Sequence, residues 1–195
     1  MSDTRSIMLV GVGGQGIILA SEVVCQALLN AGLQVKKSEV HGMAQRGGSV
    51  RTDVRFGTEV HAPLIAAGEA DLLVAFEQME ALRYAHFLRP GGEALVSTER
   101  IIPTSTLTGP HPYPADVAER LAERGARVHM IDAPALARQA GNPRTAGIVM
   151  IGALAARLEV PTPAWRRAIT ALVPERYRDV NLAAFRLGRK TTPAG

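Results

Sequence analysis

Apolar and polar positions alternate between strand-type and helix-type patterns along the whole chain of 195 residues. Short apolar runs predict buried strands at Ile7–Val10, Leu33–Glu39, Asp71–Phe76, Glu93–Ser97 and residues 126–131. Apolar residues at helical spacing predict helices at residues 15–31, 77–88, 115–124, 133–140 and 145–158, at 161–172, and from Glu175 onward. This alternation predicts an α/β fold: a three-layer α/β/α arrangement with a mostly parallel, Rossmann-like sheet and a helical C-terminal extension.

One segment has the pattern of a half-exposed strand. Between Ser49 and Phe56, apolar and polar side chains alternate with a period of two. Such alternation is typical of an antiparallel strand, so we expect one antiparallel pairing within the sheet. The pair Gly57-Thr58 predicts a turn into a second strand at Glu59–His61.

Length and charge favour one domain with a distinct C-terminal part. We expect residues 1–158 to form the α/β domain and residues 159–195 to be a basic helical extension of it. From Arg138 onward there are 10 Lys and Arg against 3 Asp and Glu, whereas the preceding part is slightly acidic. The basic end could favour an acidic partner or an anionic ligand, or it could be a solvated helix surface.

Composition argues against several classes of function. Aromatic residues make up only 4%, too few for rows of base-stacking side chains, so we expect no nucleic acid partner. We find no apolar stretch of about 20 residues and no signal-peptide pattern, which predicts no membrane association. The single cysteine, Cys25, suits a reducing cytoplasm and cannot hold an iron–sulfur cluster. The histidines lack metal-ligand spacing, so no metal site is predicted in this chain.

The strongest motif is a glycine-rich turn between the first strand and the first helix. In Gly11-Val-Gly-Gly-Gln-Gly16, the residues Gly11, Gly13, Gly14, Gln15 and Gly16 would let a ligand approach the backbone at the positive end of a helix. A nucleotide, another anion or a partner's cofactor would fit, and so would tight packing alone. The P-loop is excluded because no Lys-Ser/Thr pair follows Gly16.

A second cluster of polar residues follows the second strand, at the sheet edge predicted for the glycine turn. Its members are Glu39, His41, Gln45, Arg46 and Ser49, in a loop flanked by glycines. His41 could carry a proton, and Arg46 could clamp a carboxylate or phosphate. Glu39 also lies near the distance at which a dinucleotide site places its ribose-binding acid.

Together, the segments GVGGQGIILAS (Gly11–Ser21) and KKSEVHGMAQRGGSV (Lys36–Val50) resemble the gamma-type domain of 2-oxoacid:ferredoxin oxidoreductases. Among free-standing chains of this size, the chain is most similar to the beta subunits of indolepyruvate ferredoxin oxidoreductases. The similarity covers roughly residues 6–158. The family commonly has an asparagine near Gly147, which is missing here.

The resemblance implies an enzyme subunit that is inactive alone. A large alpha subunit would carry thiamine diphosphate, Mg²⁺ and 4Fe-4S clusters, and would decarboxylate a 2-oxoacid, with coenzyme A as acyl acceptor and ferredoxin as electron acceptor. This chain would bind none of these cofactors by itself. Glu39, His41, Gln45 and Arg46 would complete the active site or coenzyme A channel, and the glycine turn would contact the cofactor. Two alternatives stay open: a stand-alone NAD(P)-binding dehydrogenase and a non-catalytic docking subunit.

Overall fold

The computed structural model describes residues 4–41, 47–102 and 112–191. In these residues six strands form one sheet: β1 (Arg5–Val12), β2 (Gln34–His41), β3 (Ser49–Gly57), β4 (Ala70–Ala75), β5 (Leu88–Ser97) and β6 (Arg127–Ile131). The α-helices are α1 (Ile17–Asn30), α2 (Gln78–Tyr84), α4 (Val117–Glu123), α5 (Ala133–Ala140), α6 (Ala146–Ala155), α7 (Thr162–Leu172) and α8 (Arg178–Thr191). Short 3₁₀ helices lie at Ala85–Phe87, Pro143–Thr145 and Glu175–Tyr177.

The sheet is mostly parallel, as its sequence predicts, with one antiparallel insertion. The strand order is β2-β3-β1-β4-β5-β6. Strands β1, β4, β5 and β6 pair in parallel, whereas β3 runs antiparallel to both β1 and β2. Strand β3 lies between β2 and β1, so these two strands are parallel to each other but not adjacent.

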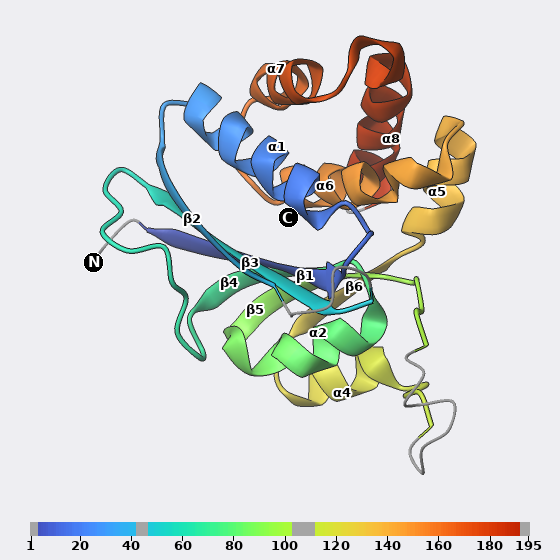
Figure 1. Ribbon diagram of the computed structural model, residues 1–195. Coiled ribbons are helices and arrows are strands. Elements are labelled where there is room, and N and C mark those ends of the chain that lie inside the picture. The colour runs from blue at the N-terminus through green and yellow to red at the C-terminus, as the bar shows by residue number, and fades with distance from the viewer. Residues whose placement is uncertain (1–3, 42–46, 103–111, 192–195) are drawn as a thin grey trace.

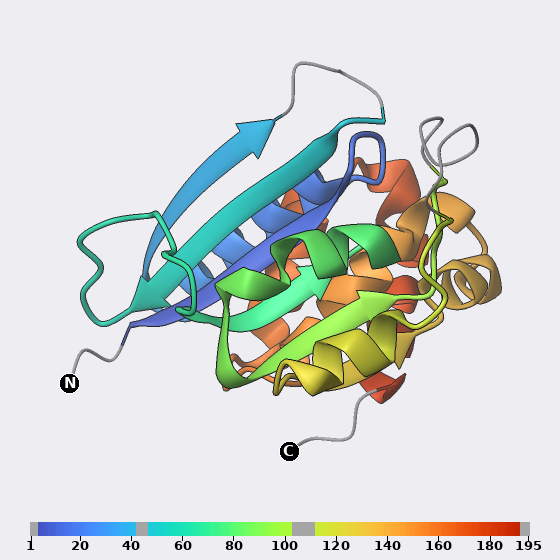
Figure 2. The ribbon, with the colours of Figure 1, turned by 90° about the horizontal axis from the view of Figure 1, so that it is seen from below.

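Helices cover both faces of the sheet (Figure 1) and make the predicted three layers. Helices α1, α5, α6, α7 and α8 form the thicker layer, and α2 with α4 covers the other face (Figure 2). One apolar core lies under each layer. Strand β1 contributes Ile7 and Leu9 to one core and Met8 and Val10 to the other, as expected for a strand buried on both faces.

The last two helices pack closely on the α/β layers. Helix α8 crosses α6 where Gly152 and Gly188 meet, and the Cα atom of Gly152 would lie 3.1 Å from a Cβ atom added at Gly188. Trp165 of α7 and Phe185 of α8 stack with ring centroids 6.0 Å apart and are almost fully buried. The small residues of α6 therefore serve the close helix packing that their sequence favours.

Two local expectations differ from the structure. Residues 58–69 contain no strand, so the hairpin expected at Glu59–His61 is wrong. This segment instead packs its Ile65 into the core beneath α2 and α4. The helix expected at 77–88 ends as an α-helix at Tyr84, because β5 already begins at Leu88. Most of the loop expected at 101–115 lies outside the described residues.

Candidate functional site

The glycine turn has the backbone conformation that its glycines allow. Strand β1 ends at Val12 and α1 begins at Ile17, with Gly16 as N-cap. Gly14 and Gly16 have φ angles of 107° and 76°, in the left-handed region that disfavours residues with a Cβ atom. The first N–H groups of α1 have no acceptor within the helix, so they and the positive helix end face the space before the turn.

Gly11 is required by close packing within the chain. It lies within β1, and a Cβ atom added there would meet Gln15 Oε1 at 2.7 Å, Ile17 Cδ1 at 2.8 Å and Phe76 Cβ at 2.9 Å. It does not line the cavity described below, whereas Gly13, Gly14, Gln15 and Gly16 do.

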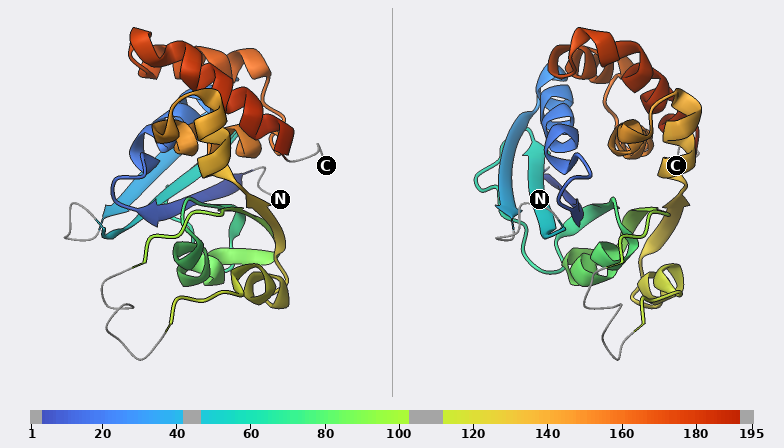
Figure 3. Two further views of the ribbon diagram at one scale, coloured as in Figure 1. Left: turned by 90° about the vertical axis from the view of Figure 1, so that its right-hand side faces the viewer. Right: turned by 45° about the vertical axis from the view of Figure 1, so that its right-hand side comes forward.

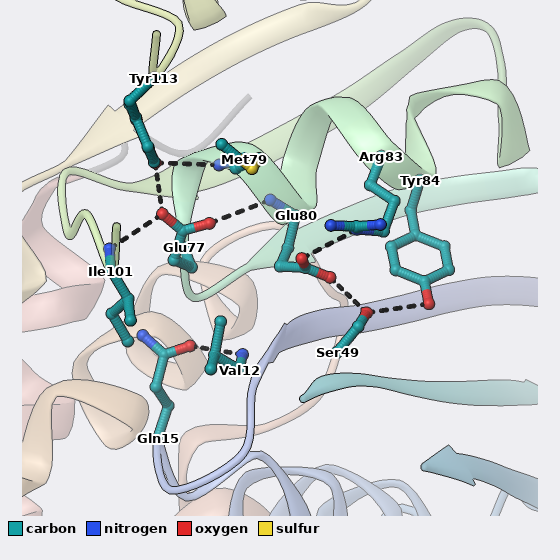
Figure 4. A network of polar contacts seen from close by, with 10 residues as sticks. All are labelled: Val12, Gln15, Ser49, Glu77, Met79, Glu80, Arg83, Tyr84, Ile101 and Tyr113. Atoms are coloured by element: carbon teal, nitrogen blue, oxygen red, sulfur yellow. Dashed lines mark hydrogen bonds and ion pairs between the residues drawn. The ribbon is translucent and has the colours of Figure 1, made fainter. Parts of the chain in front are cut away.

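The Gln15 side chain fixes the turn to the neighbouring strand end. Its Oε1 accepts a hydrogen bond from the Val12 amide at 2.8 Å, a contact drawn in Figure 4. Its Nε2 donates to the carbonyl oxygen of Phe76 at 2.9 Å and to Glu99 Oε2 at 3.2 Å. The amide group of Gln15 is therefore engaged within the chain.

The two sequence motifs meet at one edge of the sheet. The Gly13 amide donates to the carbonyl oxygen of Gly48 at 2.8 Å, and the Gly47 amide donates to the carbonyl oxygen of Gly13 at 3.4 Å. His41, the last residue of β2, lies opposite Val50 of β3 in the strand register. The backbone thus brings the end of the second motif directly beside the glycine turn.

The structure describes only some of the predicted polar residues of the second motif. Gln45 and Arg46 lie outside the described residues, as does the side chain of His41. The Glu39 carboxylate ion-pairs with Lys37 at 2.7 Å, and Lys37 also pairs with Glu22 of α1. Burial acts to lower the pKa of Lys37, but its hydrogen bonds to Glu22 and Glu39 outweigh this effect and the net pKa is raised. Glu39 does not line the cavity.

A cavity of about 480 Å³ opens in front of the glycine turn. Its lining comes from the turn, from the ends of β4 and β5, and from the starts of α5 and α6: Gly13, Gly14, Gln15, Gly16, Phe76, Ser97, Glu99, Ile101, Ala133, Pro143, Arg144, Ala146, Gly147 and Met150. The N-termini of α1, α5 and α6 therefore converge on this cavity, which favours an anionic group there. Arg144 adds a positive charge, and Glu99 is the one carboxylate in the lining.

Gly147 lies in the first turn of α6, near the place where the family that the sequence resembles commonly has an asparagine. A Cβ atom added at Gly147 would lie 3.2 Å from Phe76 Cε1 and 3.3 Å from the carbonyl oxygen of Gln15. A side chain here would thus crowd the wall between the glycine turn and α6. Its absence leaves the start of α6 close to the turn.

Two buried carboxylates lie on the other side of this edge, at the start of α2 (Figure 4). Glu77 and Glu80 are 1% and 4% exposed. Glu77 accepts hydrogen bonds from the Glu80 amide at 3.0 Å, from the Ile101 amide at 3.1 Å and from the Tyr113 hydroxyl. Burial, together with the Glu77 carboxylate, raises the pKa of Tyr113.

Glu80 links α2 to the second motif. One of its oxygens accepts from Arg83 Nε at 2.9 Å, and the other accepts from the Ser49 hydroxyl, which also lies 3.1 Å from the Tyr84 hydroxyl. Glu77 and Glu80 were not among the site residues predicted from the sequence. Their signal is an acidic residue directly after a buried strand with a second one three positions later, which resembles a capping box.

Large apolar side chains are exposed at the same edge. Ile18 and Leu19, in the first turn of α1, are 51% and 38% exposed, and Val40, near the end of β2, is 53% exposed. Within the described residues no group of three or more His, Cys, Asp and Glu side chains could hold a metal ion. None of the helices in that part of the chain combines the length and apolar character needed to cross a membrane.

Comparisons with known proteins agree with this geometry. A family model described as pyruvate ferredoxin/flavodoxin oxidoreductase matches residues 6–191. The chain is 41% identical over 188 residues to "Indolepyruvate oxidoreductase subunit IorB" of Methanothermobacter thermautotrophicus, covering 94% of this chain and 95% of that protein. It is 40% identical over 190 residues to the protein of the same name from Thermococcus kodakarensis, covering 95% and 94%.

A solved structure has the same fold over nearly its full length. The gamma subunit of a keto/oxoacid ferredoxin oxidoreductase from Geobacter sulfurreducens superposes with a TM-score of 0.71 at 27% identity, covering 96% of this chain and 97% of that one. The chain therefore belongs to the pyruvate ferredoxin/flavodoxin oxidoreductase family.

Proposed function

We propose that this chain is the small subunit of a 2-oxoacid:ferredoxin oxidoreductase acting on indolepyruvate or another aryl pyruvate. The enzyme would decarboxylate the 2-oxoacid oxidatively, transfer the acyl group to coenzyme A and pass two electrons to ferredoxin. The 40–41% identity to two indolepyruvate oxidoreductase subunits over nearly the whole chain supports this assignment.

The residues of this chain do not fit the redox cofactors, so a large partner subunit would hold them. A 4Fe-4S cluster needs about four thiolate ligands. The sequence has one cysteine, and burial raises the pKa of the Cys25 thiol to about 11, which disfavours the thiolate. The sequence also lacks a Gly-Asp-Gly motif for thiamine diphosphate and Mg²⁺.

The observation that carries the proposed role is the cavity at the glycine turn. The N-termini of α1, α5 and α6 and the Arg144 guanidinium face a space of about 480 Å³, so phosphate groups of coenzyme A would find the unpaired N–H groups of the first turn of α1 and a guanidinium there. The exposed side chains of Ile18, Leu19 and Val40 at the same edge would be covered by the large subunit. This chain would then supply one wall of a site between subunits.

The strand order argues against a stand-alone NAD(P) dehydrogenase. In a dinucleotide site the ribose-binding acid follows the strand next to the glycine-turn strand. Here antiparallel β3 separates β2 from β1, and Glu39 of β2 is paired with Lys37. Turnover with NAD by the purified chain alone would overturn the subunit proposal.

Co-expression with the large subunit tests the role of the second motif. We expect the assembled complex, but neither separate subunit, to decarboxylate indolepyruvate with reduction of ferredoxin. His41→Ala and Arg46→Ala should lower this activity while the subunits still co-elute. Full activity in both variants would show that the loop has only a structural role and would favour the docking-subunit alternative.

The cavity is tested through the affinity for coenzyme A. Arg144→Ala should raise the KM for coenzyme A about tenfold with little change in the KM for the 2-oxoacid, because a charge-assisted hydrogen bond would be lost. Arg138→Ala is the matched control, since Arg138 is also exposed but does not line the cavity. Equal KM values for coenzyme A in both variants would place its phosphates elsewhere.

A further inference from the structure

A second, larger hollow lies in the helical layer, between α7 and α8. It has a volume of about 650 Å³, and four cationic side chains line it: Arg166, Arg186, Arg189 and Lys190. Its apolar lining includes Leu182 and Phe185. One carboxylate, that of Asp179, also lines it, so the hollow carries a clear excess of positive charge.

The cations of this hollow lack acidic partners within the described chain. Ion pairs elsewhere join Arg51 to Asp53, Arg89 to Asp71 and Arg127 to Glu93. No ion pair between described residues involves a residue of α7 or α8. Arg189 donates to the hydroxyl of Thr162, which ties the start of α7 to α8 but leaves its charge unbalanced.

The lining positions of α8 form a stripe. They recur three and four residues apart, so they share one face of the helix from Leu182 to Lys190, about 12 Å along its axis. The cations Arg186, Arg189 and Lys190 occupy about the last 6 Å of this stripe. Arg186 and Lys190 also line a neighbouring hollow of about 220 Å³ that α5 borders with Gln139 and Ala140. The hollow surface therefore continues across three helices, with its cations on α7 and α8.

This stripe is separate from the glycine-turn edge. Helix α7 contacts the far end of α1, where Asn30 Nδ2 donates to the carbonyl oxygen of Ala164 at 3.1 Å. Because α1 has 14 residues, that end lies about 20 Å from the glycine turn. Both views of Figure 3 place α7 and α8 at the outside of the helical layer, away from the sheet.

We propose that the groove between α7 and α8 binds a carboxylate-rich segment of a partner protein. Arginine side chains pair with carboxylates through two parallel hydrogen bonds, and the side chains of Leu182 and Phe185 give an apolar floor for one aliphatic residue of the segment. An extended segment matches a hollow surface that continues across three helices, and several of its carboxylates would meet the cations of α7 and α8 together. The proposal does not depend on the reaction assigned to the glycine-turn site.

The test uses the full chain and a fluorescein-labelled peptide of alternating Glu and Asp residues with one central Leu. Fluorescence anisotropy should show binding at low ionic strength that weakens with added salt. The double variant Arg186→Gln/Lys190→Gln should lose about tenfold in affinity. The double variant Arg120→Gln/Arg124→Gln removes the same charge from exposed positions of α4 and its C-cap and should bind like the unchanged chain.

Two further measurements separate the groove from general attraction between a basic chain and an acidic peptide. Leu182→Asn should weaken binding of the peptide with Leu but not of an all-acidic peptide. Pyrophosphate should compete only at concentrations far above those of the peptide. Absence of binding, equal loss in both double variants, or pyrophosphate competing as well as the peptide would overturn the proposal. A cooperative thermal unfolding transition would serve as the control that each variant is folded.

Discussion

The amide of Gly13 donates a hydrogen bond to the carbonyl oxygen of Gly48 at 2.8 Å. This single bond joins two segments that are 35 positions apart in the sequence and that carry the two motifs of the candidate site. The bond requires both backbones to come close, which glycine permits at each side. The edge of the sheet at which the two motifs meet is therefore held by the backbone as well as by side chains.

Replacing Gln15 with Leu should destabilise this edge. The Leu side chain cannot accept from the Val12 amide or donate to the carbonyl oxygen of Phe76, so two backbone groups would lose their partners. We expect the free energy of unfolding to fall by about 1–3 kcal/mol, measured by urea denaturation. Gln139→Leu, at an exposed position of α5, should change it by less than about 0.5 kcal/mol. Similar values for the two variants would contradict a structural role of the Gln15 amide.

At the crossing of α6 and α8, helix propensity and packing have opposite effects on the stability of a glycine-to-alanine variant. Alanine is favoured over glycine in a helix interior by about 1 kcal/mol. A Cβ atom added at Gly188, however, would lie only 1.9 Å from the carbonyl oxygen of Val149, so α8 would have to move away from α6. Gly188→Ala should lower the unfolding free energy by about 1–3 kcal/mol.

The control for the helix crossing is Ala183→Gly on the same helix. This change removes a Cβ atom from a half-buried position and should cost about 1 kcal/mol through propensity alone. A more stable Gly188→Ala variant, measured by thermal or urea unfolding, would show that the two helices are not packed this closely.

The single cysteine should be unreactive in the native chain. Burial is the largest cause that raises the pKa of Cys25 from 9.0 to about 11. At pH 8 the native thiolate fraction should therefore be about 100-fold below that of the unfolded chain. A chromogenic disulfide reagent should react quickly only after denaturant is added. Rapid reaction of the folded chain would contradict the burial of Cys25.

The same shift predicts how stability changes at high pH. A thiol whose pKa is raised on folding holds its proton more tightly in the native state than in the unfolded state. Its contribution is fully present below pH 9.0 and is lost as the pH rises toward 11. Cys25→Ala should reduce the fall in unfolding free energy over this window.

His129 should make the chain less stable in mild acid. Burial, and then the nearby Arg157 guanidinium, lower the pKa of His129 below 6.5 in the folded state, although Glu93 acts in the opposite direction. Below pH 6.5 the unfolded chain takes up this proton more readily, so stability falls as the pH falls. His129→Gln should flatten this part of the profile of unfolding free energy against pH. An unchanged profile would contradict the lowered pKa.

Much of the fold could be predicted from the sequence because the relevant patterns are local. The run Ile7–Val10, the glycines after it and the apolar spacing of the following helix together determine a strand, a tight turn and a helix. The period of two in Ser49–Phe56 indicates an antiparallel strand before any partner is known. Alternation of strands and helices then leaves few arrangements besides three layers.

The candidate site could be predicted only in part. The sequence places the glycine turn and the second motif at one edge, and the described backbone at Gly47 and Gly48 bears this out. It could not show that Gly11 serves packing against Phe76, or that Gln15 is engaged with the chain's own backbone. Those roles depend on residues more than 60 positions away.

The sequence by itself thus determined which segments become strands and helices and where the turn chemistry lies, because these depend on neighbours within a few residues. Tertiary structure alone decided that β3 enters between β2 and β1, that Glu77 and Glu80 are buried beside Ser49, and that cations without an ion-pair partner among the described residues gather between α7 and α8. The physical reason is that strand order, burial and charge pairing are set by contacts between distant segments. Such contacts form only when the whole chain packs around its two cores.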